Sequence, residues 1–215
     1  MKKIAIILSG CGVYDGSEIH EATLTMLAIT KQGAQYSCFA PDIQQHHVIN
    51  HITGNEMEEN RNVLIESARI ARGNISSLSE LSINEFDALV LPGGFGAAKN
   101  LSDFAFNGEN CTVNKEVADI IKAFHKAKKP IGALCIAPAI IACIINNAQL
   151  TIGNDQSTAK IIEDLGSKHQ NTSHGEIVYD ELNKIITTPC YMLDANIEQI
   201  ESGAIKLMEK LIEII

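Results

Sequence analysis

The chain has 215 residues, of which 46% are hydrophobic and 20% are charged, a composition typical of a globular domain. Acidic residues outnumber basic ones by 26 to 17, and the resulting net charge of −9 argues against binding to nucleic acid or to an anionic membrane surface. The apolar runs are shorter than the roughly 20 residues that span a bilayer.

Short apolar runs alternate with helical patterns along the chain. Runs rich in Ile, Val and Leu predict strands at 3–8, 35–40, 87–91, 130–134, 176–180 and 184–188. Helical periodicity and capping signals predict helices at 18–32, 59–72, 115–128, 136–146, 157–165 and 196–214. Ser17 is the expected N-cap of the first helix. Strands separated by helices predict an α/β fold with a doubly wound, mostly parallel sheet and helices on both faces.

We expect one domain over 1–215, with an elaboration within about 41–82 that is long for a single crossover. The first eight residues contain a short apolar stretch with no cleavage site after it, which favours a buried strand over a signal peptide. The six cysteines show no C-x-x-C pair, and their spread indicates reduced thiols in a cytoplasmic protein rather than a disulfide framework. They are Cys11, Cys38, Cys111, Cys135, Cys143 and Cys190.

Cys135 stands where a predicted buried strand runs directly into an apolar helix. Pro138 suits the first turn of that helix. This strand-to-helix corner is the geometry of a nucleophile elbow, and the helix N-terminus is expected to lower the thiol pKa. The pattern alone leaves open that Cys135 is a buried, unreactive cysteine.

The Pro-Gly-Gly sequence at 92–94 follows another buried strand. Glycines there allow backbone N–H groups to approach a ligand closely. The N–H of Gly94 is a candidate donor to an oxyanion, together with the N–H of Ile136. A tight turn explains the two glycines equally well.

Several motifs in the same order resemble one family along essentially the whole chain. Residues 91–101, Leu-Pro-Gly-Gly-Phe-Gly-Ala-Ala-Lys-Asn-Leu, together with the later strand–Cys–helix corner, resemble the ThiJ/PfpI superfamily, which has the flavodoxin-like, class I glutamine amidotransferase-like fold. Segments 9–21, 62–70, 135–139 and 187–192 resemble its ElbB-type branch.

The resemblance implies a cysteine nucleophile at Cys135 that faces an acidic residue on the first helix. Counting back from the helix-ending Gly33 places this acid at Glu21, with Glu18 one turn earlier as the fallback. A buried glutamate beside a thiol should have a raised pKa and exchange protons near neutral pH. Alternatively, both carboxylates only favour the positive end of the helix.

The sequence departs from the family pattern where a histidine would be expected. Many PfpI-like members have His directly after the cysteine, but this chain has Ile136. The stretch 188–192 also lacks the His-x-Glu of glutamine amidotransferases, which argues against an ammonia-releasing enzyme. His169 is a possible helper near the thiol, although a solvated loop histidine is the alternative. His20 points away from Glu21 on a helix and is a weaker candidate.

The resemblance therefore implies a cytoplasmic glyoxalase of the hydro-lyase class, independent of glutathione, that converts glyoxal to glycolate through a Cys135 hemithioacetal and thioester. It implies no cofactor, and no metal site is expected. The implied partner is a small aldehyde, in a homodimer. The competing hypothesis is a non-enzymatic stress protein that senses oxidants through the same cysteine.

Overall fold

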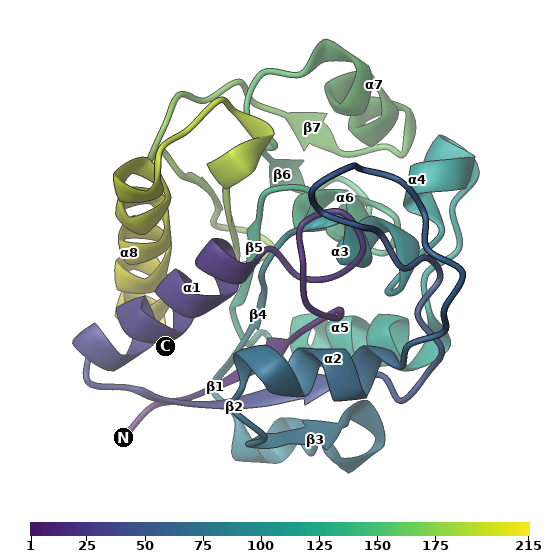
Figure 1. Cartoon of the computed structure of the whole chain (residues 1–215). Coiled ribbons are helices and arrows are strands. Elements are labelled where there is room, and N and C mark those ends of the chain that lie inside the picture. Colours follow the sequence, from purple (N-terminus) through teal and green to yellow (C-terminus); the bar gives the residue numbers. More distant parts are fainter.

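The computed structural model describes residues 1–215. Its centre is a seven-stranded sheet (Figure 1). The strand order is β3-β2-β1-β4-β5-β9-β8, and only the β8–β9 pair is antiparallel. The strands are β1 Lys3–Ile7, β2 Gln35–Ala40, β3 Ile75–Ser77, β4 Ala88–Leu91, β5 Ile131–Leu134, β8 Val178–Asp180 and β9 Ile185–Thr188. Two short strands, β6 Gln149–Leu150 and β7 Lys168–His169, form a separate parallel pair. The predicted fold class is confirmed.

Helices cover both faces of the sheet, which explains why the strands read as continuous apolar runs. In β1, Ile4 and Ile6 belong to one core, and Ala5 and Ile7 belong to the core on the opposite face. Helices α1 Ile19–Lys31, α2 Val63–Ile70 and α8 Ile197–Glu213 cover the first face. Helices α3 Phe95–Lys99, α4 Phe104–Asn107, α5 Lys115–Lys126, α6 Ala137–Ala142 and α7 Gln156–Asp164 contribute to the second. None of the helices is both long and apolar enough to cross a membrane.

The N-terminal cap of α1 differs from the predicted one. Glu18, not Ser17, is the N-cap, and its Oε2 atom accepts a hydrogen bond from the backbone N–H of Glu21 at 2.7 Å. The Ser17 hydroxyl instead accepts a hydrogen bond from the N–H of Ser9 at 2.8 Å. The Ser17 hydroxyl thus links the segment just after β1 to the start of α1, and Glu18 caps the first turn of the helix.

The region 41–82 lies between β2 and β4 and contains α2 and the strand β3, which pairs in parallel with β2. Asn62 caps α2 by accepting from the N–H of Ile65, so the helix begins later than predicted. The loop before α2 contacts the glycine-rich segment after β1, where Ile49 N–H donates to Asp15 Oδ2 at 2.7 Å. This loop therefore helps to hold the segment in place.

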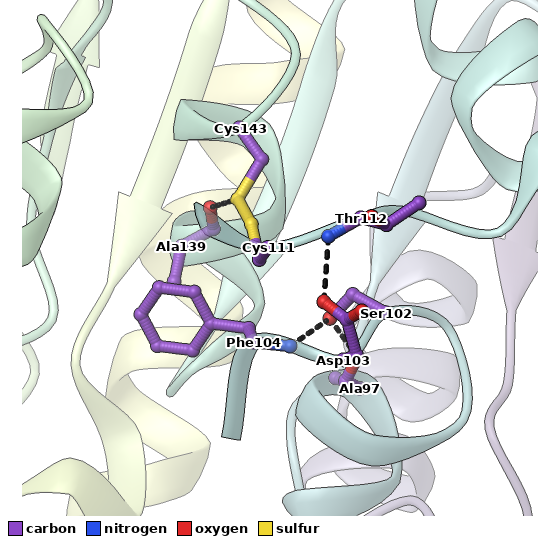
Figure 2. Close-up of a disulfide and its surroundings, with 8 residues drawn as sticks. All are labelled: Ala97, Ser102, Asp103, Phe104, Cys111, Thr112, Ala139 and Cys143. Carbon is purple, nitrogen blue, oxygen red and sulfur yellow. Dashed lines mark hydrogen bonds between the residues drawn. A yellow bond between two sulfur atoms is a disulfide. The ribbon is translucent and has the colours of Figure 1, made fainter. Parts of the chain in front are cut away.

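A disulfide joins Cys111 to Cys143 (Figure 2). Cys143 is the C-cap of α6, and Cys111 is the C-cap of the short 3₁₀ turn 108–110 that follows α4. The prediction of six reduced thiols is therefore wrong for this pair, whereas the other four cysteines are free. The spacing of the two cysteines gave no sign of the pairing, because the fold brings together residues 32 positions apart.

Candidate active site

Cys135 occupies a left-handed backbone conformation between β5 and α6, with φ of +59°. This region is costly for a residue other than glycine and is held here by the surrounding structure. Its N–H donates to the carbonyl of Thr188 on the neighbouring strand at 2.9 Å. Pro138 lies in the first turn of α6, as predicted. The strand-to-helix corner is therefore a nucleophile elbow in its backbone geometry.

Three groups lie close enough to the Cys135 sulfur to affect its protonation. They are the backbone N–H groups of Gly94 and Ile136, which lower the pKa of the thiol, and the carboxyl group of Glu21 from α1, which raises it. Gly94 has φ of +97° at the start of α3, a conformation that turns its N–H toward the sulfur and favours glycine. Two N–H donors and one carboxyl group thus converge on one thiol.

Glu21 is completely buried, and both of its carboxyl oxygens have backbone partners. Gly93 N–H donates to Oε2 at 3.0 Å, and Tyr191 N–H donates to Oε1 at 3.2 Å. Glu18 points its carboxyl to the α1 N-terminus, where it caps the helix. Of the two acids considered from the sequence, Glu21 is therefore the one that contacts Cys135.

Gly93 is required by the close approach of these two side chains. A Cβ atom at this position would lie 2.3 Å from Cys135 Cβ, 2.6 Å from Glu21 Oε2 and 3.0 Å from the sulfur. Real side chains do not tolerate such contacts, so any larger residue would push Cys135 and Glu21 apart. The close approach explains one of the two glycines of the Pro-Gly-Gly sequence.

Burial dominates the electrostatics of the pair. It raises the pKa of Glu21 to about 8, helped by the nearby charge of Glu18. Burial, together with the Glu21 carboxylate, also raises the pKa of the Cys135 thiol well above its usual value, and the Gly94 and Ile136 N–H groups offset only part of this. The predicted rise for Glu21 is confirmed, but the predicted fall for the thiol is wrong, because desolvation outweighs the helix N-terminus.

A cavity of about 290 Å³ opens onto Cys135. Ten of its twelve lining residues are hydrophobic. Helices α3, α4 and α7 and the turn 190–192 supply most of its wall, through side chains that include Phe95, Phe104, Ile161 and Met192. The Cys135 thiol therefore lies at a pocket that is large enough for a small organic molecule.

A model of the DJ-1/PfpI family matches residues 11–190, which include the Gly94 turn and the Cys135 elbow. The chain belongs to the DJ-1/PfpI family. The "ES1 protein homolog, mitochondrial" of Rattus norvegicus is 46% identical over 99% of this chain and 84% of its own length. An isoprenoid biosynthesis protein with an amidotransferase-like domain from Ehrlichia chaffeensis is 36% identical, with a TM-score of 0.93 over 99% of both chains. Glyoxalase III from Candida albicans shares the fold, with a TM-score of 0.63 at 17% identity over 99% of this chain and 96% of its own.

The name of the rat relative corrects one expectation from the sequence. That protein is named as mitochondrial, which contradicts the cytoplasmic location predicted for this chain. The prediction rested on the cysteine spacing and on the apolar start of the chain. The apolar start forms strand β1, and two of the cysteines form a disulfide. These two features therefore do not support a cytoplasmic location.

The DJ-1/PfpI site of this chain has no histidine at the thiol. His169 lies on β7, where its Nε2 accepts a hydrogen bond from Ile152 N–H at 3.2 Å, and it does not line the Cys135 cavity. The structure therefore does not bring this predicted helper to the thiol. His20 Nδ1 hydrogen-bonds the Tyr191 hydroxyl at 2.8 Å, and Tyr191 does line the cavity. His20 thus reaches the site through Tyr191, and its Nδ1 also lies 4.0 Å from Glu18 Oε1.

The walls of the cavity were missed by the sequence reasoning. Phe104 belongs to a four-residue helix without a side-chain N-cap bond, and Ile161 lies on a helix that was predicted at 157–165 without any role in the site. Their shared position is visible only in three dimensions, where α4 and α7 lie near α6 (Figure 1). No group of three His, Cys, Asp or Glu side chains in the chain is arranged to hold a metal ion.

Proposed function

We propose that this protein is a glyoxalase that converts glyoxal, or a related small 2-oxoaldehyde, to the 2-hydroxy acid without glutathione. The observation that carries the proposal is the convergence of the Glu21 carboxyl and the two N–H groups on the Cys135 sulfur. This arrangement provides a nucleophile, a proton carrier and oxyanion donors at one point, which is what a covalent isomerisation of a dicarbonyl compound needs.

In the first step, the Cys135 sulfur bonds to one aldehyde carbon while the Glu21 carboxylate takes the thiol proton. The carbonyl oxygen becomes negatively charged beside the N–H groups of Gly94 and Ile136, which already point at the sulfur. Glu21 then returns the proton to this oxygen. The product is a neutral hemithioacetal, and Glu21 is again a carboxylate that can act as a base.

In the second step, Glu21 removes the hydrogen of the attacked carbon as a proton. The electron pair moves toward the second carbonyl and forms an enediolate. Glu21 then delivers the proton to the second carbon, while the hydroxyl proton on the attacked carbon's oxygen passes to the second oxygen. The attacked carbon is oxidised to a thioester and its neighbour is reduced to an alcohol, so no external electron acceptor is needed. A pKa of about 8 lets Glu21 give and take protons near neutral pH.

In the last step, water attacks the thioester and the same N–H pair holds the oxyanion. The carbon–sulfur bond breaks, the sulfur regains its proton, and glycolate leaves. Splitting the reaction at a covalent intermediate replaces one difficult step by easier ones.

The competing hypothesis, an oxidant sensor, uses the same cysteine without turnover. Oxidation to the sulfenic and sulfinic acids proceeds through an accessible thiolate. Here the Cys135 side chain is 6% exposed and its pKa is raised. These two properties slow reaction with peroxide as they slow any attack by this thiol. We favour the enzyme because the thiol lies at an apolar cavity, which an oxidant sensor does not need.

The test is turnover of glyoxal without added thiol by the wild type and by Cys135→Ala, with glycolate measured as product. We expect turnover by the wild type and none by Cys135→Ala. Cys11→Ala, which removes a half-buried free thiol outside the cavity, should behave like the wild type. Absence of glycolate with the wild type, together with rapid oxidation of Cys135 by peroxide, would favour the sensor instead.

Membership of the ElbB-type branch and assembly into a homodimer are further parts of the proposal. The first is supported by the segments 9–21 and 187–192, which contain Glu21 and Tyr191. The second is a family expectation, which light scattering after size-exclusion chromatography would test.

A further inference from the structure

Glyoxal uses only a small part of the cavity at Cys135. It has four non-hydrogen atoms, and the cavity measures about 290 Å³, against about 30 Å³ for one water molecule in the liquid. A molecule of that size bound at the sulfur leaves room for several more carbon atoms. The site is therefore larger than the smallest substrate of the proposed reaction requires.

The groups that would act on the carbonyl lie together at the sulfur, and the other polar side-chain groups of the lining are the uncharged hydroxyls of Thr158 and Tyr191. The Glu21 carboxyl and the N–H groups of Gly94 and Ile136 surround the sulfur, where the reacting carbonyl would bind. Away from the sulfur the walls are mostly apolar, with Phe95, Phe104 and Ile161 among them.

None of the twelve lining residues has a charged side chain. A phosphate or carboxylate on the substrate would lose its water without gaining a cationic partner, which is costly. The net charge of −9 adds a weak repulsion against anionic molecules. Apolar, uncharged groups gain free energy on entering the same space.

We infer that the preferred substrates are uncharged 2-oxoaldehydes that carry an aryl group or an alkyl chain of several carbons, held in the apolar part of the cavity, rather than glyoxal or its methyl homologue. This inference rests on the proposed glyoxalase function. It assigns the dicarbonyl head to Cys135 and Glu21, and the apolar tail to the wall formed by α3, α4 and α7.

The first experiment compares kcat/KM for phenylglyoxal and glyoxal in the wild type and in Phe95→Ser. Phe106→Ser is the matched control, because Phe106 is 47% exposed against 48% for Phe95 and does not line the cavity. We expect wild type and control to favour phenylglyoxal by at least about 10-fold, the discrimination that one or more buried carbons supply. In Phe95→Ser, and in Ile161→Asn as a second variant, this ratio should fall several-fold.

The second experiment tests, without enzymatic turnover, whether the cavity favours reagents that carry an apolar group. Phenacyl bromide and bromoacetone both alkylate thiols. The rate at which each reagent modifies Cys135 is measured by mass spectrometry and divided by the rate at which the same reagent modifies free N-acetylcysteine. We expect the normalised rate to be about 10-fold higher for phenacyl bromide in the wild type, with the preference reduced in Phe95→Ser. Bromopyruvate, the anionic counterpart of bromoacetone, should be slower than bromoacetone.

The outcomes separate the two proposals. Turnover of glyoxal with no preference for phenylglyoxal would overturn the inference and leave the glyoxalase standing. Absence of turnover with any 2-oxoaldehyde would overturn the glyoxalase and the substrate class with it, and the alkylation ratio would then decide whether an apolar subsite exists. Equal normalised alkylation by the two uncharged reagents, or no alkylation of Cys135 by phenacyl bromide, would overturn the subsite itself.

Discussion

The Glu21 carboxyl group and the Cys135 thiol lie against each other in the interior of the protein, on either side of Gly93. One belongs to helix α1 and the other to the β5–α6 corner, so the fold as a whole sets their contact. Burial raises the pKa of both groups, and each holds its proton more strongly than it would in water. It follows that the resting pair is uncharged at neutral pH and that the reactive form is the pair with one proton removed.

Glu21→Gln tests the role of the carboxyl group in proton transfer. The amide keeps the volume but cannot take up a proton, so kcat for a 2-oxoaldehyde should fall by about 10²–10⁴-fold, the usual contribution of a general acid–base group. The matched control is Glu18→Gln, whose amide oxygen can still accept from the N–H of Glu21 and cap the helix. Near-normal turnover by Glu21→Gln would show that another group carries the proton.

The pH dependence of the reaction follows from the pKa of Glu21. Because that pKa is raised to about 8, only about a tenth of the molecules have the carboxylate at pH 7. The value of kcat/KM should therefore rise with pH through a midpoint near 8, which belongs to the coupled Glu21–Cys135 pair. The charge of Glu18 contributes to the raised pKa, so Glu18→Gln should move this midpoint to lower pH. A flat profile between pH 6 and 9 would contradict the assignment of Glu21 as base.

The sequence predicted correctly those features that depend on residues close to one another in the chain. Pro138 and the apolar run before Cys135 are neighbours in the chain, and they were sufficient to predict the elbow that φ of +59° at Cys135 confirms. The six predicted strands correspond to β1, β2, β4, β5, β8 and β9. The short strands β3, β6 and β7 were missed, because two or three residues give too little periodicity to detect.

The features that the sequence did not predict depend on distant segments. Cys111 and Cys143 meet only after α4 and α6 have packed on the sheet, so their spacing had no diagnostic value. The thiol pKa was predicted from the helix N-terminus alone, while the opposing desolvation depends on how deeply the fold buries Cys135. The apolar cavity is likewise assembled from separate segments, with Phe104 and Ile161 on different helices.

Gly93→Ala tests whether the close approach of Glu21 and Cys135 is required. The new Cβ would lie 2.3 Å from Cys135 Cβ and 2.6 Å from Glu21 Oε2, so the pair must separate. We expect kcat to fall by at least about 10²-fold, the scale of a misplacement of roughly 1 Å. Gly54→Ala is the control, since its Cβ meets nothing within 4 Å and its φ of +74° costs only about 1–2 kcal/mol of stability. Equal activity of both variants would show that the site adapts to the extra methyl group.

Reduction of the Cys111–Cys143 disulfide should destabilise the protein. The bond closes a loop of 32 residues, and the loss of this constraint on the unfolded chain corresponds to about 3–4 kcal/mol. Urea unfolding, followed by circular dichroism, should therefore show a lower free energy of unfolding with dithiothreitol than without it. Cys111→Ser should lose the same stability and no longer respond to the reductant, whereas Cys11→Ser, which removes a free thiol, should still respond. Identical unfolding curves for the wild type with and without dithiothreitol would contradict the contribution assigned to this bond.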